Sequence, residues 1–401
     1  MSAPSAESPA TRRSRPAAAR VALRMGCYLL AATLWLPLLR FFHEAPTDQA
    51  QALERHERRV LLDPGARAGD NAQMRQMNPE WDLMRRMYLA LSYADLALAQ
   101  PAEQVRYLGL MDLLVDDLLA TAAQDEPYVF LLPYARAAAW RNGGRSLFVD
   151  GEIAMVLEAR LLLGPRPDLE APLSVRIQAI ERAMGESPSV SGESYPDEAW
   201  TFCNTTALAA LRVHDARTGT DHAPLARRWI DYAKANLREP RSGLLASRYR
   251  YHGQIDEGPE GSSIFMVAHN LMFWDEAFAR DQYVRARTEL TFDVLGFGLA
   301  REWPLGTKAG TDVDSGPLVP VLGASPGASG MALLGAAAFG DQDTLRRLRR
   351  SMQFAAMPQS KVRGELSYGA AGPMGNAVVL HALTTGPLLQ RVLSGAAGGK
   401  S

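Results

Sequence analysis

Four short polar segments carry most of the side chains in this sequence that could do chemistry. They are residues 150–152 (DGE), 195–205 (YPDEAWTFCNT), 256–263 (DEGPEGSS) and 310–317 (GTDVDSGP). Each one combines carboxylates with Gly, Pro or Ser at an expected helix start or loop. Carboxylates that share a cavity can act as general acid and general base when burial and like-charge proximity separate their pKa values. We therefore expect the four segments to face one common cavity.

The candidate site residues come from these segments. Glu198 and Cys203 are a little over one helical turn apart, so both can reach the same opening. The candidates for acid, base or nucleophile are Glu152, Asp197, Glu198, Cys203, Glu260 and Asp312. The candidates for substrate binding are Tyr195, Trp200, Asn204, Glu257, Ser262 and Asp314. We expect the catalytic candidates to converge, and at least one carboxylate to have a pKa raised by burial beside another acid.

Each segment also has a purely structural interpretation. Asp150 can be a helix N-cap, and Glu152 a first-turn acid that the helix dipole favours. Residues 196–198 can be an ordinary helix start with Pro near its first position. Cys203 alone is more often a small buried apolar residue than a nucleophile. The two aspartates of 310–317 can cap the next helix, and that segment offers too few oxygen ligands for a calcium loop.

The composition is that of a globular chain with a large core. The 401 residues are 47% hydrophobic and 22% charged, and a net charge of −1 gives no reason to expect a nucleic-acid partner. Cys27 lies in a hydrophobic segment and Cys203 far into the globular part, so we expect no disulfide. The histidines show no HxxxH or HExxH spacing, so we expect no zinc site and no other metal site.

The N-terminal part has the pattern of a membrane anchor. Residues 1–20 carry four arginines and one acid and predict a basic cytoplasmic tail. Residues 21–42 contain an apolar run bracketed by Arg24 and Arg40 and are long enough to span a bilayer as a signal-anchor. Arginines before the span place the N-terminus in the cytoplasm and the rest of the chain on the periplasmic side of an inner membrane. A cleaved signal peptide or an amphipathic surface helix are the alternatives, although no small-x-small cleavage site follows.

The rest of the chain is predicted to be almost entirely helical. Residues 43–77, with many charges and few large apolar residues, are interpreted as a linker. From Trp81 onward, apolar residues recur at steps of three and four, and breakers divide about twelve helices over residues 78–395. Short connections predict antiparallel helical hairpins, and six of them closed in a ring give an all-α (α/α)6 barrel. An open array of TPR type is the alternative, but we find no repeat of 34 residues. Residues 244–251 and 362–368 could form short strands.

The sequence resembles the linalool dehydratase/isomerase family. The resemblance rests on FCNTTALAALRVHD, GTDHAPLARRWIDYA, WDEAFARDQY and AGTDVDSGP, which occur in this order, with weaker similarity in SYADLALAQP and DGEIAMVLEARLLLG. It implies an (α/α)6 barrel, no cofactor, and the interconversion of β-myrcene, linalool and geraniol in the bacterial periplasm. The family's enzyme is a homopentamer whose sites borrow residues from a neighbouring subunit, so the resemblance implies a possible homo-oligomer.

Several positions depart from the family's pattern. Cys203, followed by Asn204, falls on a cysteine of the family's site, but the second site cysteine is replaced by Ser194. The family's site histidine falls on Glu152, and its site tyrosine falls near Ser262. The aspartate and tyrosine that the neighbouring subunit donates have no counterpart before residue 81, where this chain has NPEWD at 78–82. The resemblance therefore implies the fold but not the terpene substrate.

Three functions remain open on the sequence. The first is a cofactor-independent lyase or isomerase that uses carboxylates as acid and base on an alcohol. The second is a carbohydrate-active enzyme of glycosidase type, because paired carboxylates with Tyr195 and Trp200 suit a sugar ring. The third is a non-catalytic envelope binding protein on the same fold. We expect a small-molecule substrate, an alcohol or a sugar, and contact with a membrane through the N-terminal helix.

Overall fold

The computed structural model describes residues 15–141, 143–307, 318–319, 321–360 and 364–398. Helices dominate these residues: α1 Arg15–Trp35, α2 Gln49–Leu62, α3 Pro64–Met77, α4 Pro79–Ala99, α5 Gln104–Asp125, α6 Leu147–Leu162, α7 Glu170–Glu186, α8 Thr201–Thr218, α9 Ala223–Asn236, α10 Gly261–Leu271, α11 Glu276–Leu290, α12 Pro326–Ala338, α13 Gln342–Ala355, α14 Gly372–Thr384 and α15 Pro387–Gly398. Short 3₁₀ helices are η1 Leu36–Phe42, η2 Pro101–Glu103, η3 Tyr128–Phe130, η4 Pro133–Arg136 and η5 Pro167–Leu169.

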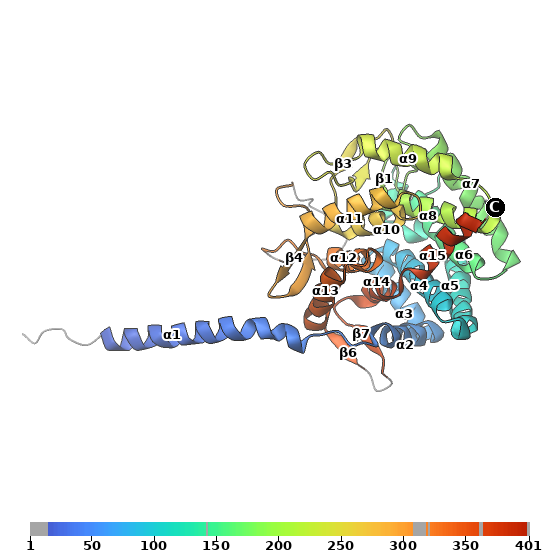
Figure 1. Ribbon diagram of the computed structural model, residues 1–401. Coiled ribbons are helices and arrows are strands. Elements are labelled where there is room, and N and C mark those ends of the chain that lie inside the picture. The colour runs from blue at the N-terminus through green and yellow to red at the C-terminus, as the bar shows by residue number, and fades with distance from the viewer. Residues whose placement is uncertain (1–14, 142, 308–317, 320, 361–363, 399–401) are drawn as a thin grey trace, which may run out of the picture.

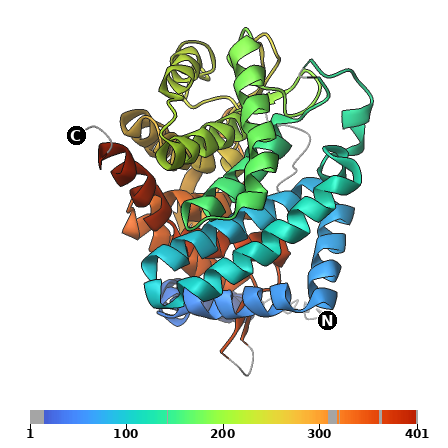
Figure 2. The same ribbon diagram turned by 90° about the vertical axis from the view of Figure 1, so that its right-hand side faces the viewer.

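Six of the helices form a closed inner ring. Along the ring, α4 contacts α6, α6 contacts α8, and the pairs α8–α10, α10–α12 and α12–α14 follow, until α14 returns to α4. The helices α5, α7, α9, α11 and α13 connect successive members of the ring and lie outside it (Figures 1 and 2). Inner helices are apolar on most faces, as α6 shows with every residue from 147 to 161 buried. The fold is therefore the (α/α)6 barrel predicted from the sequence.

The interpretation of residues 43–77 as a linker is wrong for most of that segment. Helices α2 and α3 pack against α14 and α4 and supply the sixth outer position of the barrel. Leu53 and Leu61 are buried, and Glu57 makes a buried ion pair with Arg85 of α4 at 2.8 Å. An outer helix needs only a few apolar residues, and the charged side chains of α2 and α3 form ion pairs. The composition of residues 43–77 is therefore similar to that of a linker.

Three small antiparallel sheets join the helices on the barrel's surface. One consists of β1 Ala199–Trp200, β2 Arg248–Tyr249 and β3 Ile255–Glu257, with Trp200 opposite Arg248. The second is the hairpin of β4 Thr291–Val294 and β5 Phe297–Ala300, and the third pairs β6 Pro358–Ser360 with β7 Leu366–Tyr368. Two of these strands, β2 and β7, fall inside the segments that the sequence marked as possible strands.

The N-terminal helix projects away from the barrel (Figure 1). Residues Ala17–Phe42 of α1 and η1 form a helix long and apolar enough to cross a membrane, and its apolar window has no buried residue. A signal sequence has the same length and composition, so the helix alone does not distinguish an anchor from a leader. The expected membrane-spanning helix is thus present as an apolar helix near the N-terminus.

The C-terminal helix lies across the C-terminal ends of the inner helices. Helix α15 contacts α4 and α8, and the Leu388 N–H donates to Asp95 Oδ1 at 2.8 Å. Burial raises the pKa of Asp95 to about 8, although backbone N–H groups at Leu388 and Gly386 act in the opposite direction. His381 and His269 lie beside it with edge-to-face rings at 5.8 Å, and burial lowers the pKa of His269 to about 4. These groups line an internal cavity of about 10 Å³, which is room for roughly one water molecule.

The role of α2 and α3 in the barrel leads to a truncation test. Deleting residues 1–43 removes only the apolar helix, so we expect a soluble protein with one cooperative unfolding transition. Deleting residues 1–77 also removes the sixth outer layer, exposes α14 and α4, and leaves Arg85 buried without Glu57. We expect little soluble protein from this second deletion. Soluble yield and thermal unfolding followed by circular dichroism measure both. Equal stability of the two truncated chains would contradict the structural role of α2 and α3.

Candidate functional site

Carboxylates gather at the N-terminal ends of the inner helices. Because each inner helix is separated from the next by an antiparallel outer helix, all six inner helices begin at the same end of the barrel. Glu80 lies in the first turn of α4, Glu152 in the second turn of α6, Cys203 in the first turn of α8, and Glu260 is the N-cap residue of α10. Helix N-termini carry partial positive charge, which favours carboxylates there. We call this the N-terminal end of the barrel.

Glu152 is the most unusual carboxyl group of the cluster. Its side chain is fully buried, and neither of its oxygens has a hydrogen-bond partner among the described residues. Burial raises the pKa of Glu152 well above its ordinary value, and the nearby Glu80 raises it further. The side chain therefore favours the neutral acid, which can donate a proton. The expected raised carboxyl pKa is present at this residue.

Glycine brings Glu152 close to the helix that carries Cys203. A Cβ atom on Gly151 would lie 3.2 Å from the Cβ atom of Ala207, which is tighter than an ordinary carbon–carbon contact, so glycine favours the close approach of α6 and α8. The Cys203 thiol is buried, and burial together with Glu152 and Glu80 raises its pKa, whereas Ser194 acts in the opposite direction. Cys203 therefore favours the neutral thiol, which can donate a hydrogen bond but is not a thiolate nucleophile.

Two stacked tyrosines connect the buried acids to the rim. The rings of Tyr134 and Tyr195 are parallel with centroids 4.7 Å apart. The Tyr195 hydroxyl donates to Glu80 and accepts from the backbone N–H of Leu132 at 3.0 Å. The Tyr134 hydroxyl donates to Glu198 Oε2 at 3.1 Å. Burial and the neighbouring carboxylate raise the pKa of both phenols, so each stays protonated and donates.

Arginines neutralise the acids of the rim. Arg248 on β2 forms ion pairs with Glu198 Oε1 at 3.2 Å and Glu257 Oε2 at 3.3 Å. Its guanidinium also lies over the indole ring of Trp200 at 5.7 Å. Asp197, whose backbone has a φ of +60°, pairs with Arg141 at 3.6 Å and with Arg250 at 3.7 Å. Glu198 therefore lies beside an arginine rather than in a cluster of like charges. Removing its charge would break an ion pair instead of relieving repulsion.

The remaining candidates differ in their environments. The Ser262 N–H and hydroxyl both donate to Glu302 Oε1, at 3.1 and 2.5 Å. The amide of Asn204 is engaged at both ends by backbone: its oxygen accepts from Gly192 N at 3.0 Å, and its nitrogen donates to Trp200 O at 2.9 Å. Asn204 thus has a structural role between two loops. Asp312 and Asp314 lie outside the described residues.

Some buried polar atoms at this end of the barrel lack partners. Among the described residues, the Trp200 indole N–H is buried and lacks a hydrogen-bond partner, like both Glu152 oxygens. Leaving such a group unsatisfied costs about 1–3 kcal/mol of stability. Unsatisfied polar atoms beside carboxylates suit the binding of a polar ligand group.

Sequence reasoning missed several members of the site. Glu80, Tyr134, Arg248 and Glu302 lie in none of the four segments, although all contact residues of those segments. Glu80 follows Asn78 and Pro79, and so it has the same signature of an acid at a helix start. Treating every such start alike would have found Glu80. Tyr134 and Arg248 gave no signal, because a 3₁₀ turn and a two-residue strand position them.

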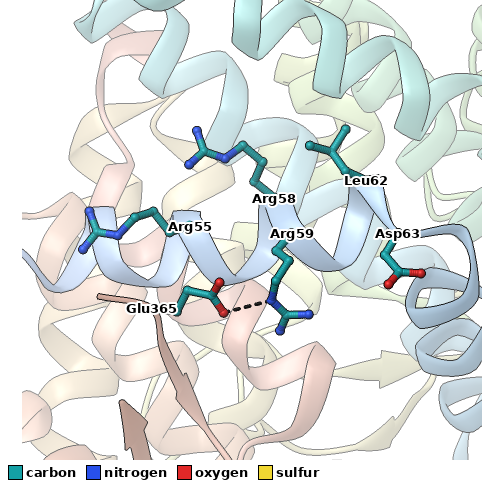
Figure 3. A pocket seen from close by; sticks show the side chains of 6 residues that line it. All are labelled: Arg55, Arg58, Arg59, Leu62, Asp63 and Glu365. Carbon is teal, nitrogen blue, oxygen red and sulfur yellow. Dashed lines mark hydrogen bonds and ion pairs between the residues drawn. The ribbon is translucent and has the colours of Figure 1, made fainter. Parts of the chain in front are cut away.

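One open hollow lies on α2, away from the carboxylates described above. It has a volume of about 400 Å³ and is lined by Arg55, Arg58, Arg59, Leu62, Asp63 and Glu365. Figure 3 shows the Arg59 guanidinium turned toward Glu365, to which Nε donates at 2.9 Å. Arg55 donates to the carbonyl of Gly364, so two of these arginines are engaged within the protein. Among the described residues, no group of three or more His, Cys, Asp or Glu side chains could hold a metal ion.

The fold and the buried acids define a class of protein: an (α/α)6 barrel with a carboxylate cluster at the N-terminal ends of its inner helices. Residues 176–372 match the family model of linalool dehydratase/isomerase, which confirms the family resemblance over that part of the chain. The match includes Tyr195, Glu198, Cys203 and Arg248, whereas Glu80 and Glu152 lie before it.

Solved structures with a similar chain path are glycoside hydrolases. A GH76 α-mannanase from Bacteroides thetaiotaomicron is 11% identical, with 78% of this chain and 87% of that chain covered at a TM-score of 0.48. A family 105 glycoside hydrolase from C. acetobutylicum is 10% identical, with 79% and 97% covered at a TM-score of 0.45. A comparison with curated proteins gives no match.

The environment of Glu152 predicts a pH-dependent effect of its removal. The unfolded chain releases this proton near the ordinary pKa of 4.5, whereas the folded chain keeps it, so stability falls as pH rises above that value. Glu152→Gln removes this loss. We expect its melting temperature to equal that of the parent near pH 4.5 and to exceed it increasingly toward alkaline pH, as measured by thermal denaturation.

The matched control is Glu158→Gln on the same helix. Glu158 is equally buried but pairs with Arg217 at 2.9 Å and with His214. Removing its charge should destabilise the protein by about 1–3 kcal/mol at neutral pH, because Arg217 loses a buried partner. If Glu152→Gln destabilises the protein to the same extent, Glu152 is a structural acid and the site assignment fails.

Proposed function

We propose that this protein is a cofactor-independent lyase or isomerase that acts on an alcohol at the N-terminal end of its barrel. The observation that carries the proposal is Glu152, a fully buried carboxyl group without partners that favours its neutral form beside a second acid, Glu80. The match to linalool dehydratase/isomerase supports the reaction class, since that name describes dehydration and isomerisation.

The chemistry assigns the two acids opposite roles. Glu152 donates its proton to the hydroxyl group of the alcohol, so that the C–O bond breaks and water leaves. A proton from the adjacent carbon passes to the Glu80 carboxylate, and the C–H electrons form the C=C bond. Glu152 is then ionised and Glu80 protonated. Return of the proton from Glu80 to Glu152 restores the starting state, and the raised pKa of Glu152 favours that return.

Neighbouring side chains position these acids. The Tyr195 hydroxyl holds Glu80 by a hydrogen bond, and its stack with Tyr134 fixes the ring. Cys203 and Ser194 lie close to the acids and can hydrogen-bond the substrate oxygen. Isomerisation would use the same groups, with water returning to a different carbon after the dehydration step.

The proposed location is the periplasmic side of an inner membrane. The apolar helix Ala17–Phe42 supports a single crossing, and the four arginines of residues 1–20 favour a cytoplasmic N-terminus. The barrel would then lie outside the cytoplasm, anchored by α1.

A carbohydrate substrate is the second candidate. The stacked Tyr134–Tyr195 pair and the partly buried Trp200 provide aromatic surfaces beside Glu198, which would suit a sugar ring. In that case Glu152 would still be the acid, and it would protonate a glycosidic oxygen instead of a free hydroxyl.

Turnover of defined substrates tests the proposal. We expect the detergent-solubilised full chain to convert at least one allylic alcohol, such as linalool or geraniol, into an alkene or an isomeric alcohol detected by gas chromatography. Glu152→Gln should reduce the rate by about 10²–10⁴-fold, because the general acid is lost. Glu276→Gln, which changes an exposed acid on α11, should leave the rate unchanged. Release of sugars from glycans with no reaction of alcohols would favour the second candidate, and inactivity on both panels would favour a binding protein.

A further inference from the structure

Exposed apolar side chains surround the point at which the N-terminal helix meets the barrel. They lie on η1, on the β4–β5 turn and at the C-terminal end of α13: Phe41, Phe42, Val294, Leu295, Phe354 and Met357. Their exposed fractions run from 43% for Val294 to 74% for Phe42. We call this group the exit patch. Single exposed apolar residues are ordinary, but a group of this kind marks an interaction surface.

Contacts between the three elements hold them together at the end of the apolar helix. The His43 ring, which follows η1 directly, lies 5.1 Å from Phe354 and 6.0 Å from Phe297. Phe297 and Phe354 are themselves 5.0 Å apart. Arg347 of α13 pairs with Asp293 of β4 at 2.9 Å. The β4–β5 hairpin therefore packs against α13, and both contact His43 at the end of the apolar helix.

Two residues of the patch combine a strained backbone conformation with an exposed apolar side chain. Leu295 has a φ of +55° at the β4–β5 turn, and Met357 has a φ of +53° just before β6. Such a conformation is unfavourable for a residue with a side chain, and two-residue hairpin turns usually place Asn or Gly there. Both side chains are nevertheless large, apolar and exposed to solvent. Packing within the barrel does not account for them.

The hairpin turn reaches into the span of the apolar helix. A Cβ atom on Gly296 would lie 3.0 Å from the Cδ atom of Arg40, so the turn touches a residue two positions before Phe42, where the apolar helix ends. The turn therefore lies against the side chain of Arg40, in the last part of the apolar helix. Interfacial apolar groups lie about 5–10 Å deep at the headgroup–acyl boundary. A bilayer crossed by this helix would therefore contain the turn.

Basic residues flank the exit patch. Arg40 and the four arginines of α13 (Arg346, Arg347, Arg349 and Arg350) face three acids, Glu44, Asp293 and Asp343. The excess positive charge favours anionic lipid headgroups.

We propose that the exit patch inserts into the headgroup–acyl boundary of an anionic bilayer, the one that helix Ala17–Phe42 crosses. The inference rests on the membrane-spanning role proposed above. This docking also fixes which end of the barrel faces the membrane. The outer helices α11 and α13 have their C-terminal ends at the N-terminal end of the barrel, and the exit patch lies beside these ends. Strand β5 continues through Arg301 to Glu302, which binds Ser262. Figure 1 shows α15 on the side of the barrel away from α1. The carboxylate cluster therefore lies at the membrane-facing end.

Fluorescence quenching in the full-length protein tests this docking. Leu295→Cys and Met357→Cys are made in a Cys27→Ser background, and buried Cys203 stays unlabelled. Each variant carries an environment-sensitive fluorophore and is reconstituted in phosphatidylcholine vesicles that contain a minor share of phosphatidylglycerol. Val105→Cys, which is exposed at the start of α5 on the opposite end of the barrel, is the control. Emission is measured with lipids that bear a quencher near the headgroup, and separately with aqueous iodide.

The expected result is that labels at 295 and 357 lose most of their emission to the lipid quencher and little to iodide, whereas the label at 105 does the reverse. Iodide quenching at 295 equal to that at 105, in protein that floats with the vesicles, would overturn the docking and leave the anchor intact. Protection of 295 from both quenchers would also overturn it, because it would show a protein partner on the patch. Protein that does not float with the vesicles would overturn the anchor itself, and the docking with it. None of these outcomes depends on turnover.

Discussion

The parallel direction of the six inner helices is the constraint on which the rest of this structure depends. Because every inner helix is followed by an outer helix that returns the chain, six N-termini meet at one end of the barrel and six C-termini at the other. The partial positive charges of the N-termini stabilise carboxylates at that end, such as Glu80, Glu260 and Glu302. Against this background, Glu152 is the exception, since it lies one turn deeper and has no partner among the described residues. Depth, rather than helix dipole, decides its protonation state.

The two ends of the barrel differ chemically for the same reason. At the C-terminal ends of the inner helices, Asp95, His269 and His381 are enclosed by α15 around a cavity that holds roughly one water. Burial disfavours charge on each of them, so the pKa of Asp95 rises to about 8 and that of His269 falls to about 4. Both shifts favour the neutral forms of these groups. At this end Asp95 accepts a hydrogen bond from the backbone of α15, whereas at the other end the Glu152 oxygens have no hydrogen-bond partner among the described residues.

The sequence predicted the barrel because helical periodicity is a local property that packing reinforces. It marked Glu152, Glu198 and Cys203 as candidate site residues because Gly, Pro and acids at helix starts are also local signals, and the structure places them at one end of the barrel. It failed for α2 and α3, whose apolar residues are few and whose charges are paired with distant partners such as Arg85 and Glu365. It also failed for Tyr134 and Arg248, because residues 64 and 50 positions away from Glu198 meet it only through tertiary contacts. The ion pair of Glu198 with Arg248 could not be predicted for the same reason, since the arginine lies outside the acid's own segment.

The position of the carboxylate cluster relative to the anchor bears on the choice between the two candidate substrates. If the N-terminal end of the barrel faces a bilayer, a substrate that partitions into lipid arrives there at high local concentration, and a lipophilic alcohol meets this condition better than a hydrophilic glycan. The buried site agrees with this, because Glu152 and Cys203 are enclosed among apolar side chains and keep their protons for lack of water. A glycan would instead have to reach the paired acids of the rim, where Arg248 already neutralises Glu198 and Glu257. Under the proposed function, the same desolvation that favours the neutral form of Glu152 would favour a substrate that brings few polar groups with it.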